Sequence, residues 1–517
     1  MTSKFEITRR GVLVGAAGLS AAAIFPGSTV LAADGKRVVL RIAKQIQNID
    51  PPFRTGVSDG NVIHAVFQTL VGYKPGEFTH VMDAASKVEQ VSPTEIAFTL
   101  KPGQMFSGGY GEMTGDDVKF SFERYLHPDA DGKVSSYKSD WANLVEVRVH
   151  DTYSGSLIFS KPSPAVWDVA IVGSSGAIQS RKAVAALGAK HSQTPIGSGP
   201  YKVASFEPQQ GLTLVAHTDY AGEKPFFDTC DLRYIGNEKT AQLALRAKEI
   251  DFTELSTEAA NEIANVAGLK VTKHPSLRFI WMGMNMQRGA LADIRVRQAI
   301  RLAVDVDQMI LAGYQGDAQR LNSMIPPGIL GFWTDAPVYQ RDVEKARALL
   351  AQAGVKTPMT LKLTILNEPS FQNMALVAQA LLGEAGINVE IDQREAGTYW
   401  SSGKGQSGEE LELFFLRFNA VVDPNFNTRW FLPDQIGDWN WQRFSDPQYA
   451  KLHEESSVNT DKDSREKQII EMQKLMDASA SMVWLTNDVF AFGAREGLQP
   501  AVLPNGNDWQ MRFFRQV

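Results

Sequence analysis

Several short strings in the sequence match patterns that carry chemistry in enzymes. Gly56-Val57-Ser58-Asp59-Gly60 has the spacing of a nucleophile elbow, in which a serine sits on a sharp turn after an apolar strand. The preceding residues, 51–55, include two prolines and an arginine, so they do not predict such a strand. Two Ser-x-x-Lys strings, at 135–138 and 401–404, lack the companion motifs of the serine enzymes that use this pattern. These strings therefore predict no catalytic residue.

Metal and nucleotide chemistry is not supported by the spacing of the relevant residues. The eight histidines are scattered, and no two of them stand four positions apart as zinc ligands on one helical face do. Cys230 is the only cysteine, which excludes an internal disulfide and a cysteine zinc site. No glycine-rich phosphate loop follows a predicted strand. We expect no metal, no cofactor and no enzymatic activity.

The composition is that of a globular protein. The chain has 517 residues, of which 44% are hydrophobic and 21% are charged. This length suits about two to four domains of ordinary size. The formal net charge is −6 and no stretch is strongly basic, so we expect no nucleic-acid partner.

The N-terminal segment has the features of an export signal. Lys4, Arg9 and Arg10 form a charged head, and residues 11–25 are mildly apolar. Val30-Leu31-Ala32 offers small residues at a cleavage site, and residues 8–13 fit the twin-arginine pattern. We predict that residues 1–32 are a twin-arginine signal peptide and that the mature protein lies in the periplasm. No cysteine stands directly after the apolar run, so we expect no lipid anchor.

Strands and helices are expected to alternate along the rest of the chain. Residues 61–70 place five apolar side chains on one helical face, with Asn61 as the expected N-cap. Asp293 is expected to cap a helix whose buried stripe begins at Val296. Further strands are predicted at 37–43, 211–216, 278–284 and 361–366, and further helices at 343–353, 371–385 and 464–478. The pattern predicts an α/β fold.

Five blocks of sequence, in order, resemble the family 5 extracellular solute-binding proteins of ABC importers, the peptide, nickel and opine group. Residues 98–126, FTLKPGQMFSGGYGEMTGDDVKFSFERYL, are similar to the signature "f.Lr.gvkFhdG.p.tAeDV.fs.er" of that family. Residues 284–310 resemble "N....p..d.rVRqAi..aiDr..ii". The other three blocks are residues 40–51, 60–76 and 195–217. The resemblance covers essentially the whole chain after the export signal.

This resemblance implies a two-lobed clamshell that binds a solute between its lobes. Lobe I with an extra subdomain would span residues 33–280, lobe II residues 281–489, and residues 490–517 would return to lobe I. The protein would act as a monomer that delivers its solute to the membrane permease subunits of an ABC importer.

The resemblance also suggests which residues contact the solute, because family contacts come mainly from loops that face the cleft. Aromatic rings, amides and guanidinium groups are suited to that task. The candidates are Asn48, Asp50, Arg54, Tyr110 and Trp141 on the first lobe, and Asn285, Trp400, Arg417, Asn419 and Trp439 on the second. A structural role is the alternative for each of them, such as an Asx-turn at Asp50 or a core position for Trp141.

One segment departs from the pattern of the peptide-binding members. They carry a string like "ADYpDP", whose first Asp pairs with the α-ammonium of the peptide, whereas residues 419–424 here read Asn-Ala-Val-Val-Asp-Pro. Ala420 then stands at the ammonium-binding position. We therefore expect a solute other than an ordinary peptide: an opine, a sugar-phosphate conjugate, an oligosaccharide or a modified peptide. Arg54 and Arg417 would bind an anionic group of it.

Two alternatives remain open at this stage. The protein could bind oligopeptides with a different mode of recognition for the N-terminus. It could also be a periplasmic hydrolase or a chaperone built on the same scaffold, because a fold does not fix a function.

Overall fold

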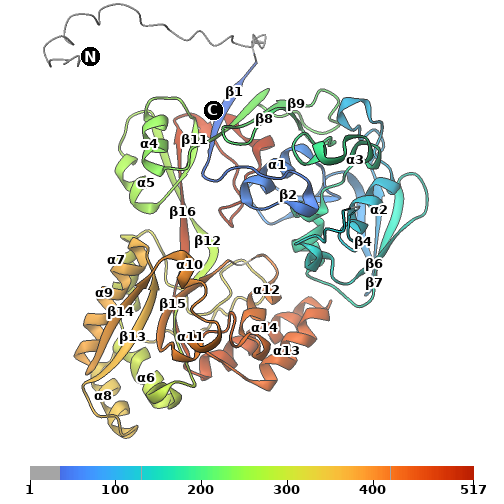
Figure 1. Cartoon of the computed structure of the whole chain (residues 1–517). Coiled ribbons are helices and arrows are strands. Elements are labelled where there is room, and N and C mark those ends of the chain that lie inside the picture. Colours follow the sequence, from blue (N-terminus) through green and yellow to red (C-terminus); the bar gives the residue numbers. More distant parts are fainter. Residues whose placement is uncertain (1–34, 130, 420) are drawn as a thin grey trace, which may run out of the picture. The chain divides into compact units, whose positions relative to one another are not determined.

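The computed structural model describes residues 35–129, 131–419 and 421–517, and the body from Lys36 to Val517 forms one compact unit (Figure 1). The predicted signal peptide, with its twin-arginine pair and its cleavage site, lies outside the described residues. Ala420 also lies outside them. No helix within the described ranges is both long and apolar enough to cross a membrane.

A ten-stranded mixed sheet runs through the whole body, in the order β14-β13-β15-β12-β16-β11-β1-β10-β9-β8. Its longest strands, β12 and β16, are antiparallel: Leu269 pairs with Arg495 at one end, and Gly283 pairs with Met482 at the other. The register shifts between Pro275 and Phe279. The strands are β1 (Arg37–Ile42), β8 (Tyr201–Glu207), β9 (Gly211–Ala216), β10 (Thr229–Tyr234), β11 (Phe252–Leu255), β12 (Leu269–Met284), β13 (Met359–Leu366), β14 (Ile387–Arg394), β15 (Leu413–Phe418) and β16 (Met482–Arg495).

The buried hydrophobic residues fall into separate clusters on the two sides of this register shift. Three clusters are built from residues 38–263 together with residues 490–514. A fourth and larger one is built from residues 277–485. We name residues 36–271 and 490–517 the first lobe, and residues 277–489 the second lobe. The chain boundaries predicted at 280 and 489 fall inside β12 and β16, the two strands that cross between the lobes.

The first lobe adds smaller sheets to the main one. A four-stranded antiparallel sheet has the order β4-β5-β7-β6, and β2-β3 and β17-β18 form two-stranded sheets. Its further elements are β2 (Val71–Tyr73), β3 (His80–Met82), β4 (Ala85–Ser92), β5 (Glu95–Leu100), β6 (Leu144–Val149), β7 (Ser154–Phe159), β17 (Leu498–Gln499), β18 (Arg515–Gln516), α1 (Val57–Val66), α2 (Gly115–Glu123), α3 (Arg181–Leu187), α4 (Glu238–Arg246) and α5 (Thr257–Ile263).

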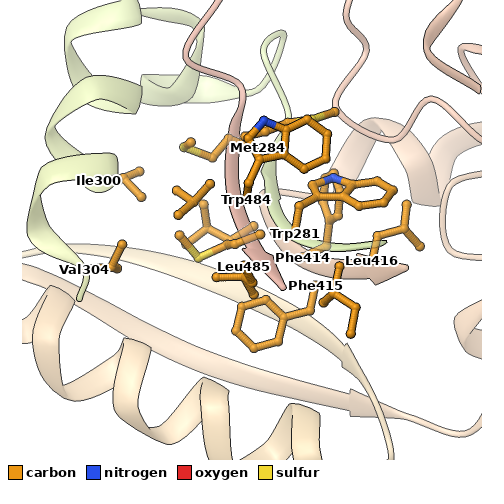
Figure 2. Packing of buried hydrophobic residues seen from close by; sticks show 14 of the residues in the cluster. Trp281, Met284, Ile300, Val304, Phe414, Phe415, Leu416, Trp484 and Leu485 are labelled. Atoms are coloured by element: carbon orange, nitrogen blue, oxygen red, sulfur yellow. The ribbon is translucent and has the colours of Figure 1, made fainter. Parts of the chain in front are cut away.

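The second lobe packs its helices against an aromatic core. Trp281, Trp484, Phe414 and Phe415 come from three adjacent strands and belong to the same buried cluster as Ile300 of α6 (Figure 2). Such rings bury large apolar area and hold the strands together. Its helices are α6 (Ile294–Ala303), α7 (Val306–Tyr314), α8 (Val343–Gln352), α9 (Pro369–Glu384), α10 (Ala396–Tyr399), α11 (Gly405–Glu410), α12 (Pro424–Thr428), α13 (Pro447–Val458) and α14 (Lys462–Ala478).

The α/β class predicted from the sequence is confirmed, and local signals place many elements correctly. Asp293 caps α6 by accepting a hydrogen bond from the Arg295 amide, and Val296 is buried as expected. The predicted N-cap role of Asn61 is wrong, because α1 begins at Val57 after Gly56. Asn61 is buried within the helix and holds the C-terminal segment: its Nδ2 donates to the Asn507 carbonyl (3.2 Å). Its Oδ1 accepts from the Trp509 amide (2.9 Å).

Candidate functional site

A cavity of about 470 Å³ has walls from both lobes. This volume lies in the range of small-molecule sites, about 300–1,000 Å³. The first lobe contributes the titratable side chains that line it, which are Arg54, His64, Tyr73, Asp83, Tyr137, Asp140, Asp168, Asp508 and Arg512. The second lobe contributes neutral ones, which are Leu277, Asn419, Val421, Val422 and Phe426. The charge in this cavity therefore comes from one wall.

Arg54 and Asp140 form an ion pair, and both side chains are hydrogen-bonded to Ser175. The Arg54 guanidinium lies over the ring of Tyr137, 3.4 Å from its centroid, and 3.8 Å from the Asp140 carboxylate. Ser175 Oγ donates to Asp140 (2.5 Å) and accepts from Arg54 (3.2 Å). Burial raises the pKa of Asp140, although Ser175 and Arg54 oppose that rise. The two charges largely neutralise each other.

Asp83 and Arg512 form a second ion pair in the same wall, with Nη1 3.2 Å from Oδ1. Burial alone would lower the pKa of Arg512, but Asp83 and Tyr220 outweigh it and raise that pKa. Asp168 accepts hydrogen bonds from the Tyr73 hydroxyl (3.0 Å) and contacts His80 Nε2 (2.8 Å). These contacts leave both aspartates with stabilising partners.

Asp508 differs from Asp83 and Asp140, each of which faces an arginine. Its carboxylate accepts a hydrogen bond from the neutral Asn505 amide group (2.7 Å), and no Lys or Arg of the described residues forms an ion pair with it. The segment that carries it is fixed to α1 through Asn61. A carboxylate that faces a solute cavity with only a neutral partner favours a positive group there.

His64 lies near this carboxylate. Burial lowers its pKa, while Asp508 acts in the opposite direction. Its Nε2 is 3.1 Å from Ser174 Oγ. Burial therefore favours the uncharged form of His64 in the first-lobe wall.

All ten residues predicted to contact the solute are described by the structure, and two of them, Arg54 and Asn419, line the cavity. Asn419 Oδ1 accepts a hydrogen bond from Arg278 Nε (2.9 Å). Arg278 in turn pairs with Asp488 (2.8 Å), so the amide is held from β12 and β16. The prediction that these residues bind solute stays a prediction, and their position fits it.

The charged candidates Asp50 and Arg417 are occupied by partners within the protein. Asp50 accepts two hydrogen bonds, both 2.7 Å, from Arg124, and Asn48 Oδ1 accepts from the Asp50 amide in an Asx-turn. Arg417 makes two hydrogen bonds, 2.7 and 2.6 Å, to Glu368. These two charges are neutralised away from the cavity, so the expectation that Arg417 serves an anionic group loses its support.

The other candidates pack inside their own lobes. Trp141 is buried on Phe122, at 4.4 Å between ring centroids, and its indole N–H donates to the Ser175 carbonyl. Asn285 is fully buried and its Nδ2 donates to the Leu411 carbonyl (2.9 Å). The remaining ones, partly buried against the hydrophobic clusters, are Tyr110, Trp400 and Trp439. Their positions argue for structural roles.

The sequence reasoning missed most of the charged wall. Asp83, Asp140, Asp168, Asp508 and Arg512 come from loops and short helices without a recognised motif. Ser58 of the GxSxG string lies on α1 and is not on a strand-to-helix turn. Only the three-dimensional approach of residues 54–83, 137–174 and 503–512 brings these groups together.

Comparison with known proteins gives a consistent assignment. The model of the bacterial extracellular solute-binding proteins, family 5, matches residues 81–438. The probable D,D-dipeptide-binding periplasmic protein DdpA of Escherichia coli (strain K12) is 26% identical over 461 residues, which is 87% of this chain and 88% of that protein.

Solved structures share the fold. The ABC transporter substrate-binding protein CtaP of Listeria monocytogenes superposes with a TM-score of 0.84, at 19% identity, over 93% of this chain and 99% of that one. MoaA of A. tumefacien R10, in complex with mannopinic acid, gives a TM-score of 0.71 at 23% identity, over 93% and 99% of the two chains. With two lobes, a cavity between them and a family model that matches more than half of its length, this chain belongs to the family 5 bacterial extracellular solute-binding proteins.

Proposed function

We propose that this protein is the periplasmic solute-binding component of an ABC importer, and that it captures a small amino-acid-derived solute, a peptide or an opine, for delivery to the permease. DdpA is described as a D,D-dipeptide-binding protein, and MoaA was solved with mannopinic acid. A cavity of about 470 Å³ suits solutes of that size.

The observation that carries the choice of solute is the unequal charge of the first-lobe wall. Two of its four aspartates, Asp83 and Asp140, face arginines, whereas Asp508 has a neutral partner. An ammonium or amine group on the solute would supply the missing positive charge. Sugar phosphates and neutral oligosaccharides carry no such group, so the structure favours them less.

A calorimetric panel tests this proposal. The panel contains D-alanyl-D-alanine, L-alanyl-L-alanine, mannopinic acid, glucose 1-phosphate and maltotriose. We expect at least one of the first three to bind with a Kd between about 1 μM and 1 nM, or roughly −8 to −12 kcal/mol. The bound solute should be recovered intact by mass spectrometry. Binding restricted to glucose 1-phosphate or maltotriose, or turnover of any solute, would contradict the proposal.

Export by the twin-arginine route is the second part of the proposal, and it is supported by residues 1–32. Changing Arg9 and Arg10 together to Lys should leave the precursor in the cytoplasm. Cell fractionation measures how much precursor stays in the cytoplasm. Lys4→Arg serves as the control, because it changes a basic residue outside the arginine pair and keeps its charge. Normal amounts of mature double variant in the periplasm would show that another route is used.

A further inference from the structure

Phe78 joins the hydrophobic clusters of the two lobes. It lies in the turn between β2 and β3, in the first lobe, and lines the cavity. It packs against the first-lobe cluster that contains Tyr73 and against the second-lobe cluster that contains Leu277. Among the partly buried hydrophobic side chains of residues 35–129, 131–419 and 421–517, it alone packs against clusters of both lobes. β12 and β16 connect the lobes through the backbone, whereas Phe78 connects them through a side chain.

The second lobe provides part of the cover over Phe78. Residues 74–77 before it and Thr79 after it are exposed, whereas Phe78 itself is partly buried. Its ring meets the ring of Tyr73 edge-on, with the centroids 5.4 Å apart. The other side of the contact is the second-lobe cluster. Separation of the lobes would therefore return apolar area of this ring to water.

The turn that carries Phe78 is fixed to the first lobe by Gln510. Gln510 Nε2 donates to the Tyr73 and Lys74 carbonyls (3.1 and 3.3 Å). Its Oε1 accepts a hydrogen bond from the Gly76 amide (2.9 Å). The turn is thus held on three backbone groups and moves with the first lobe. A change in the angle between the lobes then has to break the contact of Phe78 with the second-lobe cluster, because the turn cannot follow the second lobe.

We propose that Phe78 is a latch between the lobes, which stabilises the closed arrangement even when no solute is bound. The proposal rests on the proposed function, in which a solute enters and leaves the cavity as the lobes separate. The latch depends on apolar area that leaves water, so it needs no particular group on the solute. If a solute gains its full contacts only in the closed protein, the affinity for every solute scales with the closed fraction.

The distance between the lobes without solute is the first measurement. Lys87→Cys in β4 and Lys451→Cys in α13 place exposed labelling sites on the two lobes, while the native Cys230 is buried. Pulsed electron paramagnetic resonance between two spin labels gives the distribution of distances. Phe78→Ala in this labelled protein should lower the share of the closed distance, because the latch is lost. An unchanged distribution would overturn the proposal.

Two further variants separate a latch from a general loss of packing. Phe78→Leu keeps an apolar side chain and should give an intermediate distribution of distances. Phe226→Ala removes a partly buried phenylalanine that packs against a first-lobe cluster alone, so the distances should stay unchanged. Thermal unfolding checks that each variant is folded. If Phe226→Ala separates the lobes as much as Phe78→Ala does, the contact between the lobes is not the cause and the proposal is wrong.

Solute affinity is the second measurement. Phe78→Ala should raise the Kd of D-alanyl-D-alanine, L-alanyl-L-alanine and mannopinic acid by one common factor, about tenfold for the partial exposure of a phenylalanine ring. The rate of solute release, followed by stopped-flow displacement, should rise by a similar factor. A loss that differs strongly between the solutes would mean that Phe78 contacts the solute, which contradicts a latch.

The two measurements separate failure of this inference from failure of the proposed function. If no solute of the panel binds, but Phe78→Ala separates the lobes, the proposed solute class is wrong while the latch stands. If a solute binds, and both its release rate and the distances are unchanged in Phe78→Ala, the proposed function stands and the latch is wrong.

Discussion

The two walls of the cavity differ in how they present charge. The first-lobe wall exposes four aspartates and two arginines, most of them already paired or hydrogen-bonded. The second-lobe wall exposes an amide and apolar side chains. Under the proposed function, the first lobe sets the electrostatic selectivity, and the second lobe adds shape and an amide.

Away from the cavity the lobes are more alike, because each contains a buried aspartate–arginine pair. In the second lobe Asp423 lies 2.6 Å from Arg465, and their side chains are 1% and 8% exposed. In the first lobe Asp50 lies 2.7 Å from Arg124, with side chains 11% and 15% exposed. Burial raises the pKa of Asp423 against the opposing effect of Arg465.

The largest effect is expected when one member of these pairs is removed. Asp423→Ala should lower the free energy of unfolding by about 3–5 kcal/mol, because it leaves the Arg465 charge buried without a partner. Asp50→Ala should cost less, since water reaches that pair more easily. Denaturant unfolding measures both, with Asp461→Ala at the N-cap of α14 as an exposed control in the second lobe. An equal or larger loss in Asp50→Ala would break this ranking.

The next effect is a dependence of stability on pH that both lobes share. Burial lowers the pKa of His191 in the first lobe to about 4 and that of His453 in the second lobe to about 4. An unfolded histidine titrates near 6.5. As the pH falls from about 6.5 to about 4, the unfolded state takes up protons first, so the free energy of unfolding decreases.

For the fully buried His191 this decrease amounts to about 3 kcal/mol at most, and His191→Gln should remove it. Urea unfolding at pH 7 and at pH 4.5 measures the effect, and His127→Gln is the control because His127 is not buried. If the stability of His191→Gln still falls as steeply between these two pH values as that of the unchanged protein, burial of this ring is not the cause.

A smaller effect is expected on solute affinity from the charged wall. Asp508→Asn should weaken binding of a solute with an ammonium group by about 10- to 150-fold, which corresponds to about 1.5–3 kcal/mol for a charged hydrogen bond. Its melting temperature without solute should change little, because within the described residues the one side-chain donor to this carboxylate is the neutral Asn505. Calorimetry with the solute of highest affinity in the panel measures the loss. Unchanged affinity would mean that Asp168 or Asp140 receives the positive group.

The sequence predicted the elements better than the site, for a physical reason. Periodic apolar residues and local caps such as Asp293 act over a few positions, so the α/β pattern was evident from neighbouring residues. The fate of a polar side chain depends on partners far along the chain. Asp50 meets Arg124, 74 positions away, and Arg417 meets Glu368, 49 positions away. No local pattern could separate these structural charges from those of the cavity.

The C-terminal segment illustrates the same limit. Asp508 faces the cavity because Asn61, 446 positions from Asn507, fixes the loop that carries it. Asn61 was expected to be an N-cap because an asparagine before an apolar helix is a local signal for that role. The hydrogen bonds of Asn61 are instead made to a segment far along the chain. Arg54 and Asn419 were identified because the family resemblance, and not their spacing, pointed to their loops.

The smallest effect should come from the neutral wall, at Asn419. Asn419→Ala removes one amide, so affinity should fall only about three- to tenfold, as expected for a neutral hydrogen bond of about 0.5–1.5 kcal/mol. Asn419 Oδ1 also accepts a hydrogen bond from Arg278. Asn419→Ala removes that hydrogen bond but retains the ion pair between Arg278 and Asp488. The loss should therefore be similar for solutes with and without a carboxylate. Calorimetry with L-alanyl-L-alanine and its C-terminal amide, which lacks the carboxylate, compares the two cases, and Val422→Ala provides an apolar control in the same wall. A loss larger than that of Asp508→Asn, or one confined to the peptide with the free carboxylate, would show that the second-lobe wall contributes to charge selection. The two walls would then not divide this task.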